Sequence, residues 1–233
     1  MAEITVALIS KLRSRTGAGL GNCRKALMET DGDIEAAIDS LRKKGIATAA
    51  KKAGRSTLEG VITQTIAPGA KIGVIAEINC ETDFVAKNEK FQKFCDEVAK
   101  AYLDDPNVDL EAKRTDKVAE IGENIQFARH ERLEIEGSGS IAAYIHHGAK
   151  VGVLVGVSTG KESTIETEEY KQLVKDITLQ IAAASPVAVS RDELDSALIA
   201  KEKEIAAEQF KDKPAAAVEK ILEGKMEKYY QTV

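Results

Sequence analysis

The sequence predicts an α+β protein with a three-helix bundle, a duplicated core of small antiparallel sheets and helices, and a helical hairpin. Three observations support this class. Apolar residues recur at helical spacing near both ends of the chain. Between these ends, runs rich in β-branched residues flank Gly-Ala-Lys turns, a pattern typical of β-hairpins. The hairpin pattern, followed by a helical pattern, occurs twice at one constant offset, which indicates an internal repeat.

The first segment, residues 1–46, is expected to form three short helices joined by tight turns. Apolar residues at helical spacing predict the first helix over residues 4–14, and a glycine-rich loop follows it. Asn22 is expected to cap the second helix and Asp33 the third, which Gly45 would end. A bundle of this size buries a small core, and such units commonly serve to bind a partner.

The glycine-rich loop, residues 17–21, invites comparison with a dinucleotide-binding fingerprint. Asn22 stands where that pattern needs glycine, and a helix precedes the loop where the fold needs a strand, which argues against it. The glycines are instead expected to permit positive backbone angles in a tight turn. Leu20 is the large apolar residue of this loop. It either folds back onto the bundle or is presented to a partner.

The core, residues 57–188, contains two copies of one unit at an offset of 79 residues, which places Gly60 on Gly139. We assign residues 57–136 to the first copy and residues 137–188 to the second. Each copy is expected to form a strand, a turn, a second strand, a loop and a helix. Residues identical at this offset in the hairpin include Gly60, Ile62, Ile66, Gly69, Ala70, Lys71, Gly73 and Val74, which fall on Gly139, Ile141, Ile145, Gly148, Ala149, Lys150, Gly152 and Val153.

The first copy continues beyond this shared unit. Residues 113–122 are expected to form a helix and residues 125–135 a strand. No equivalent strand follows in the second copy before Val233, so the second sheet is expected to be incomplete or the polypeptide to be cut.

The two copies differ most at two places. In the loop after the second strand, Phe84 of the first copy corresponds to Ser163 of the second, and at the hairpin turn Pro68 corresponds to His147. Phe84 either covers the sheet–helix core beneath it or is an anchor for a pocket on a partner. Asp83, beside it, can accept hydrogen bonds from backbone amides.

The charge pattern favours a protein partner over nucleic acid. The chain has 38 acidic and 33 basic residues, a net charge of −5 and a pI near 5.5. Residues 47–56 are expected to form a linker helix or hinge, and its basic residues Lys51, Lys52 and Arg55 are too few for more than weak phosphate binding. No apolar run approaches the roughly 18 residues of a membrane span.

No catalytic or metal-binding pattern is recognisable, so we expect neither enzyme activity nor a cofactor. His146 and His147 are adjacent and therefore cannot form the i, i+4 pair of a zinc-binding helix. Three cysteines, Cys23, Cys80 and Cys95, are expected to be small core residues in a reducing compartment. Without a secretory or transit signal, the chain is expected to be cytoplasmic.

The last segment, residues 189–231, is expected to form an antiparallel helical hairpin or coiled coil. Ser190 and the acids after it predict the start of one helix, which runs to about Phe210. Residues 211–214 are expected to turn the chain, with Pro214 at the first position of the second helix.

These residues resemble the bacterial elongation factor Ts family, and the resemblance covers nearly the whole chain. The loop Thr82-Asp-Phe-Val85-Ala86 is similar to the signature of that family. The other matching runs are Leu12-Arg13-Ser-Arg-Thr16-Gly-Ala-Gly19, Cys23-Arg-Lys-Ala-Leu27, Gly32-Asp-Ile34, Lys117 to Asn124, and His147-Gly148.

The resemblance implies a guanine-nucleotide exchange factor that binds elongation factor Tu carrying GDP, displaces Mg²⁺ and promotes GDP release. It further implies that residues 1–46 form a domain like the ubiquitin-associated type. The residues associated with dislodging Mg²⁺ would be Thr82, Asp83, Phe84 and Val85, and further partner contacts would be Arg13, Leu20, His147 and Gly148. The alternative is a passive adaptor, in which the three-helix head binds a partner and the core is a spacer without exchange activity.

Overall fold

A computed structural model of the chain describes residues 3–210 and 214–231. The contacts divide the chain into two compact units, Met1–Thr167 and Glu168–Val233. The first unit holds six α-helices and two small antiparallel sheets among its described residues, and the described part of the second is helical. The predicted α+β class is therefore confirmed.

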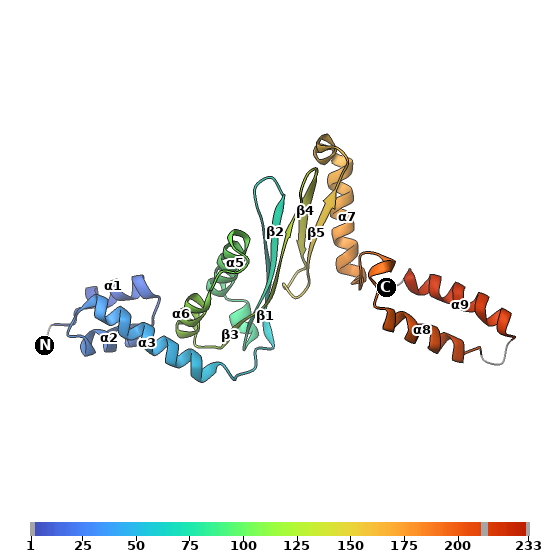
Figure 1. Ribbon diagram of the computed structural model, residues 1–233. Coiled ribbons are helices and arrows are strands. Elements are labelled where there is room, and N and C mark those ends of the chain that lie inside the picture. The colour runs from blue at the N-terminus through green and yellow to red at the C-terminus, as the bar shows by residue number, and fades with distance from the viewer. Residues whose placement is uncertain (1–2, 211–213, 232–233) are drawn as a thin grey trace. The chain divides into compact units, whose positions relative to one another are not determined.

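Three helices form a bundle at the start of the first unit: α1 (Val6–Thr16), α2 (Leu20–Glu29) and α3 (Ile34–Lys52) (Figure 1). Gly17 ends α1 in the left-handed conformation, with φ of 68°. As predicted, Asp33 caps α3, since its side chain accepts hydrogen bonds from the amides of Glu35 and Ala36. The buried core of the bundle consists of Leu12, Cys23, Ala26, Leu27 and Ala37.

Two predicted helix boundaries in this bundle are wrong. Asn22 does not cap α2, because the helix begins at Leu20 after Gly19, whose carbonyl accepts from the amide of Cys23. Leu20 therefore lies in the first helical turn. Gly45 does not end α3, which continues to Lys52. A Cβ at Gly45 would lie 3.3 Å from the Cβ of Ala119, so the glycine allows close packing of α3 on the later helix that carries Ala119.

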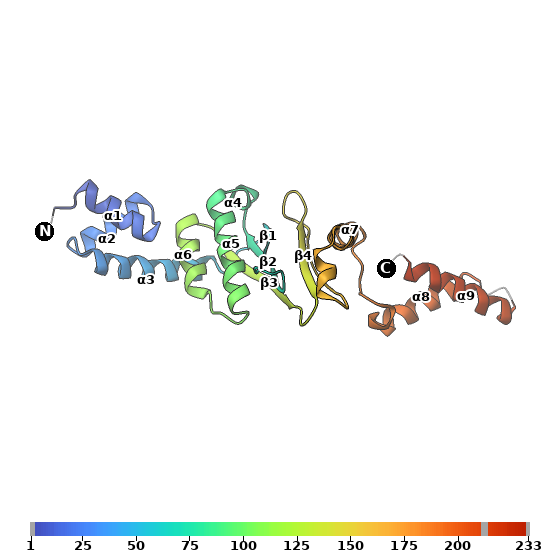
Figure 2. The same ribbon diagram turned by 90° about the horizontal axis from the view of Figure 1, so that it is seen from above.

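The first sheet has the strand order β1-β2-β3, with β1 (Glu59–Ile66), β2 (Ile72–Cys80) and β3 (Ile125–Glu134) all antiparallel. Between β2 and β3 the chain forms α4 (Asp83–Ala86), α5 (Glu89–Asp104) and α6 (Glu111–Ile121). Helix α5 packs on β1 and β2 and covers one face of the sheet (Figure 2). Its buried face includes Phe91, Phe94, Cys95 and Val98.

The second sheet consists of β4 (Gly139–Ile145) and β5 (Gly152–Ser158), which are antiparallel and lead into the 3₁₀ helix η1 (Glu162–Glu166). Its backbone repeats that of the first copy. Gly69 and Gly148 have φ of 84° and 89°, and Ala70 and Ala149 have φ of 53° and 54°. Both hairpin turns thus have the geometry that the duplicated sequence predicts.

The two hairpins pack on each other through equivalent contacts, side by side in both ribbon views (Figures 1 and 2). The amide of Ile62 on β1 donates to the carbonyl of Ala149 in the second turn at 2.8 Å. The amide of Ile141 on β4 donates to the carbonyl of Ala70 in the first turn at 2.7 Å. Ile62 corresponds to Ile141 in the repeat, and Ala70 to Ala149, so the contacts are reciprocal, as they are across a two-fold axis.

The second unit contains α7 (Glu168–Ala184), the short 3₁₀ helix η2 (Arg191–Glu193), α8 (Ser196–Glu208) and α9 (Ala215–Tyr230). Helices α8 and α9 contact each other. The guanidinium of Arg191 makes two hydrogen bonds, of 2.7 and 2.8 Å, to the carboxylate of Glu227 and lies over the ring of Tyr230. These contacts join η2 to α9.

The start predicted for the first hairpin helix is wrong. Ser190 precedes η2, and α8 begins only after Asp195, whose side chain accepts from the amide of Ala197. Ser190 and Asp195 are both residue types that commonly begin helices, and it is Asp195 that begins the longer one. Pro214 is the N-cap of α9 rather than its first residue. The predicted turn over residues 211–213 lies outside the described residues.

Candidate partner-binding site

Phe84 lies on α4, a single helical turn where the sequence predicted a loop. We call Thr82 and α4 together the Phe84 turn. The side chain of Phe84 is 82% exposed, so it does not cover the core. The turn is anchored after Phe84, because Val85 packs against the core and Ala86 is buried. It is capped before Phe84 by Thr82, whose Oγ1 accepts from the amide of Val85 at 3.4 Å. An aromatic ring is therefore held outward between two fixed ends.

The carboxylate of Glu123 braces the start of this turn. Its Oε2 accepts from the amides of Glu81 and Thr82, at 3.1 and 3.0 Å. Its Oε1 accepts from the hydroxyl of Thr82 at 2.6 Å. On the other side, the thiol of Cys80 donates to the carbonyl of Thr82 at 3.2 Å. Hydrogen bonds to a carboxylate are stronger than bonds between neutral groups, so Glu123 holds Glu81 and Thr82 firmly in place.

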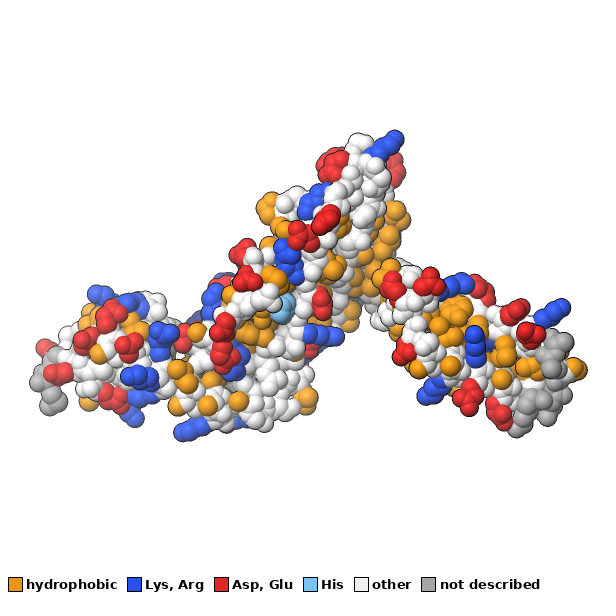
Figure 3. All heavy atoms as spheres, in the orientation of Figure 1, with side chains coloured by type: hydrophobic (Ala, Val, Ile, Leu, Met, Phe, Trp, Pro, Cys, Tyr) orange, Lys and Arg blue, Asp and Glu red, His pale blue; other side chains and the backbone are white. Residues whose placement is uncertain are grey.

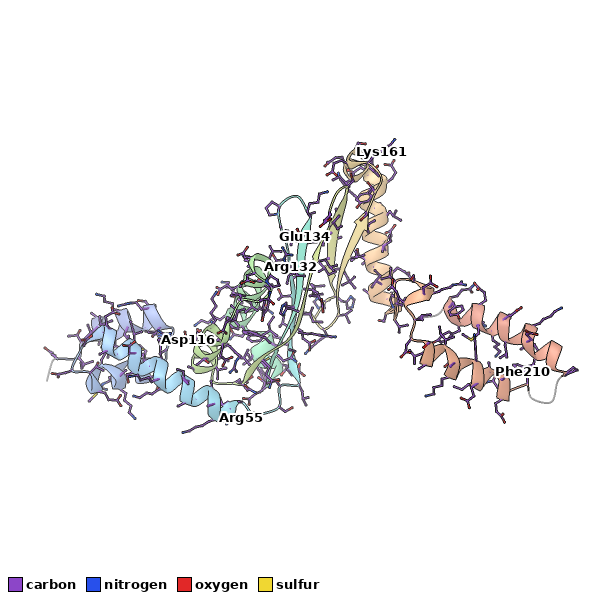
Figure 4. The ribbon with its side chains drawn as sticks, viewed as in Figure 1. Arg55, Asp116, Arg132, Glu134, Lys161 and Phe210 are labelled. Atoms are coloured by element: carbon purple, nitrogen blue, oxygen red, sulfur yellow. The ribbon has the colours of Figure 1, made fainter. Side chains whose placement is uncertain are left out.

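A second group of bonds holds Glu81. The amide of Asn124 donates to Glu81 Oε1 at 2.6 Å and thereby lowers the pKa of that carboxyl. Arg55, which Figure 4 marks just beyond α3, forms an ion pair with Glu81 at 3.4 Å. Asn124 is fully buried, and its Nδ2 donates to the carbonyl of Arg55 at 2.9 Å. These contacts connect α3, the end of β2 and the start of β3.

Asp83 forms an ion pair with the residue that directly follows α4. Its Oδ2 lies 2.7 Å from Nζ of Lys87, one turn further along the chain, and this hydrogen bond lowers the pKa of Asp83. Asp83 is only partly buried, so its carboxylate remains accessible beside Phe84.

The His147-Gly148 turn lies at the same end of the packed hairpins as the Phe84 turn. Glu59 on β1 is the strand partner of Cys80, from which the chain enters the Phe84 turn. The ammonium of Lys150, just beyond His147, reaches Glu59 Oε2 at 2.5 Å. Phe84 and His147, one residue from each of the two sequence differences between the copies, therefore lie at one end, and His147 and Gly148 are exposed there.

The opposite end of the hairpins is joined by contacts within the chain. The ammonium of Lys71 donates to the carbonyls of Gly137 and Gly139, at 2.9 and 2.8 Å, and pairs with Glu162 at 3.1 Å. Glu162 is the counterpart of Asp83 in the repeat. Lys161, the counterpart of Thr82, also lies beyond β5 (Figure 4).

Arg13 and Leu20 lie on the three-helix bundle rather than on the hairpins. Arg13 is exposed near the end of α1, and Leu20 is 51% exposed at the start of α2. The exposure of Leu20 favours presentation over folding back onto the bundle. Figure 3 shows acidic and basic side chains interspersed on the visible faces, in agreement with the mixed charge of the sequence.

The cysteines are free and buried, as predicted. Burial raises the pKa of the Cys80 thiol to about 11 and also raises that of Cys95, which disfavours their reactive thiolate forms. His146 is paired with the hydroxyl of Tyr144, at 2.8 Å from Nδ1. Within residues 3–210 and 214–231, no group of three or more potential metal ligands occurs. No helix in these ranges is long and apolar enough to cross a bilayer.

Sequence reasoning missed the residues that support the Phe84 turn, namely Glu81, Glu123 and Asn124. Glu123 and Asn124 lie in a run that contributes to the family resemblance, yet no role follows from their types alone. One available signal is their position, because they directly follow Gly122, which ends α6 in the left-handed conformation, and directly precede β3. Such junction residues commonly bond to neighbouring loops.

Comparison with known proteins identifies the family. The profile described as "Elongation factor TS" matches residues 81–233. A protein named "Elongation factor Ts" from Symbiobacterium thermophilum is 42% identical over 242 residues, covering 100% of this chain and 80% of the relative. This chain belongs to the elongation factor Ts family. A second elongation factor Ts, from Hydrogenovibrio crunogenus, is 41% identical over 246 residues, covering 99% of this chain and 80% of the relative.

Membership of the elongation factor Ts family confirms the resemblance inferred from the sequence and makes the chain a translation elongation factor. A third elongation factor Ts, from Desulfovibrio desulfuricans, is 40% identical and is matched over 100% of this chain and 85% of its own length.

Proposed function

We propose that this chain binds elongation factor Tu in its GDP-bound state and promotes the release of GDP. It acts by binding to a GTPase rather than as an enzyme. The observation that carries the proposal is the exposed ring of Phe84, held outward on a turn whose two ends are fixed. An exposed aromatic ring held on a braced turn is the arrangement expected of an anchor that inserts into a pocket on a partner.

The mechanism is a wedge that acts on the metal of the partner. Mg²⁺ joins the nucleotide phosphates to a GTPase, so moving the protein ligands of the metal weakens nucleotide binding. Phe84 and Asp83 enter between helices of the partner, and Thr82 and Val85 complete the inserted segment. Burying one Phe supplies roughly 1.5–3 kcal/mol, which corresponds to a shift of about tenfold or more. By reciprocity, bound nucleotide weakens the hold of the factor to the same extent.

Further contacts extend the interface. His147 and Gly148 lie at the same end as Phe84 and form a second contact with the partner, while Arg13 and Leu20 of the bundle form a third. In this proposal residues 1–46 are a ubiquitin-associated-like head, 47–56 a linker, 57–136 and 137–188 the two core subdomains, and 189–231 an antiparallel coiled coil. The protein works in the cytoplasm, where translation takes place.

The test is the release of fluorescent GDP from elongation factor Tu, measured with the wild-type chain and with Phe84→Ala. Phe84→Ala is expected to slow the release by at least about tenfold. The repeat supplies a matched control, because Ser163 is the counterpart of Phe84 and is exposed. Ser163→Ala is expected to leave the rate unchanged.

The outcomes separate the alternatives. Equal release rates with the wild type and Phe84→Ala would exclude the wedge mechanism. If the wild-type chain binds elongation factor Tu without accelerating GDP release, and Leu20→Ala abolishes that binding, the passive adaptor is the correct function.

A further inference from the structure

Glu123 directly follows Gly122, the C-cap of α6, and lies 41 positions along the chain from Thr82, yet it makes three hydrogen bonds to the residues that begin the Phe84 turn. Two of these bonds reach backbone amides and one reaches a hydroxyl. The carboxylate itself is partly buried and does not belong to the exposed tip. Its hydrogen bonds therefore fix the conformation of the turn, and the carboxylate is not part of the surface that the turn presents to a partner.

The bonds reach Phe84 through Thr82. The hydroxyl of Thr82 donates its proton to Glu123 Oε1, and its oxygen accepts from the amide of Val85. One hydroxyl thus links Glu123 to the cap of the helical turn. Without Glu123, this hydroxyl is free to rotate away from the cap, and the amides of Glu81 and Thr82 lose their acceptor. The backbone on the N-terminal side of Phe84 is then held less firmly, by the bond from the Cys80 thiol to the carbonyl of Thr82 and by the contacts of the Glu81 side chain.

We propose that Glu123 is a positioning residue for nucleotide exchange, which fixes Glu81 and Thr82 so that Phe84 is already held outward before the partner arrives. This inference rests on the proposed function of the Phe84 turn. A segment that is ordered beforehand loses little conformational entropy on binding, so the brace strengthens association. Glu123 has no role in the displacement of the metal itself, which belongs to the tip.

The first experiment needs no partner. The chain contains no Trp, so Phe84→Trp introduces a single indole at the tip of the turn. Time-resolved fluorescence anisotropy of this variant reports the local motion of the side chain. Adding Glu123→Ala is expected to increase the amplitude of fast motion, and Glu123→Gln, which keeps a carbonyl acceptor, is expected to give a smaller increase. Glu97→Ala, on the exposed face of α5, is the charge-matched control and should have no effect. Unchanged motion in Glu123→Ala would overturn the proposal.

The second experiment measures GDP release from elongation factor Tu against the concentration of the factor. Glu123→Ala is expected to raise the half-saturating concentration by roughly tenfold, the scale of ordering one or two backbone residues on binding. The maximal rate should remain that of the wild type, because Phe84 is still present in the bound complex. Glu123→Gln is expected to recover part of the loss.

A double-mutant cycle separates positioning from general support of the fold. In a Phe84→Ala background, Glu123→Ala is expected to cause a clearly smaller loss, because the ring is gone and only Asp83 and its neighbours remain to be positioned. The same loss in both backgrounds would show a merely structural role and overturn the proposal. If the wild-type chain does not accelerate GDP release at all, the proposed function fails, whereas the anisotropy measurement still decides whether Glu123 holds the turn.

Discussion

Replacing Gly73 or Gly152 by alanine tests the reciprocal packing of the two hairpins. A Cβ at Gly73 on β2 would lie 2.7 Å from Cγ2 of Ile141, and a Cβ at Gly152 on β5 would lie 2.6 Å from Cγ2 of Ile62. Gly73 corresponds to Gly152 in the repeat, and Ile62 to Ile141. The two variants therefore introduce one methyl group into equivalent surroundings, each against the other copy.

The size of the effect follows from these distances. Carbon atoms in contact are normally about 3.5–4.0 Å apart, so each new methyl group requires a movement of about 1 Å. Overpacking of this kind costs about 1–3 kcal/mol. Replacing Gly by Ala also restricts the unfolded chain, which favours folding by about 0.4–1 kcal/mol. We expect each variant to lower the free energy of unfolding by about 1–2 kcal/mol, and the two values to be similar.

Thermal unfolding followed by circular dichroism measures both variants. At about 2–4 °C per kcal/mol for a chain of this size, the expected decrease in melting temperature is easily resolved. Gly160→Ala is the control, because nothing lies within 4 Å of a Cβ there, and its effect should stay within about 0.5 kcal/mol. A loss in one glycine variant without a comparable loss in the other would refute the reciprocal packing.

Three further predictions concern single side chains. Phe84→Ala should change the free energy of unfolding by less than about 0.5 kcal/mol, since the ring is 82% exposed, whereas Phe91→Ala, at a fully buried position, should lower it by about 3–5 kcal/mol. Urea denaturation measures both, and equal losses would contradict the exposure of Phe84. Lys87→Met should raise the pKa of Asp83 toward its ordinary value, because the bond to Lys87 lowers it. The stabilisation from ionised Asp83 is fully present above the ordinary carboxyl pKa and is lost as the pH falls through the lowered pKa of Asp83. An NMR titration that shows the same Asp83 pKa in Lys87→Met as in the wild type would exclude this pairing. Because burial raises the pKa of Cys80 to about 11, its thiol should react with iodoacetamide near neutral pH only after unfolding, and mass spectrometry of the folded, treated chain should show Cys80 unmodified.

The repeat made the core predictable because turn geometry depends on local residue types. Positive φ at Gly69 and Gly148 follows from the turn sequence, and both strands of each hairpin follow from that turn. Helix boundaries were less predictable. Gly45 is a plausible helix end by propensity, yet its contact with Ala119 keeps α3 intact, and this contact joins residues far apart in the sequence. A propensity cost of about 1 kcal/mol is small enough for such packing to offset.

The sequence singled out Phe84 but left open whether its ring is exposed, and it gave no indication of the residues that support it. Phe84 stood out because its counterpart in the repeat is Ser163, and its exposure agrees with the anchor interpretation. The brace from Glu123 was not predictable, because a carboxylate has the same character whether it faces water or a distant backbone amide. Only the fold brings Glu123 to Thr82. The same holds for the turn at His147, which reaches the Phe84 end through the packing of the hairpins.

The reciprocal packing of the hairpins explains how the two ends of this core can carry different residues. Two separate copies of one segment, associated about a two-fold axis, must present identical residues at both ends. Covalent linkage makes the association intramolecular, so it no longer depends on protein concentration. It also releases the two ends from being identical. One end of this core can therefore carry Phe84 and His147, while the other carries Ser163 and Pro68.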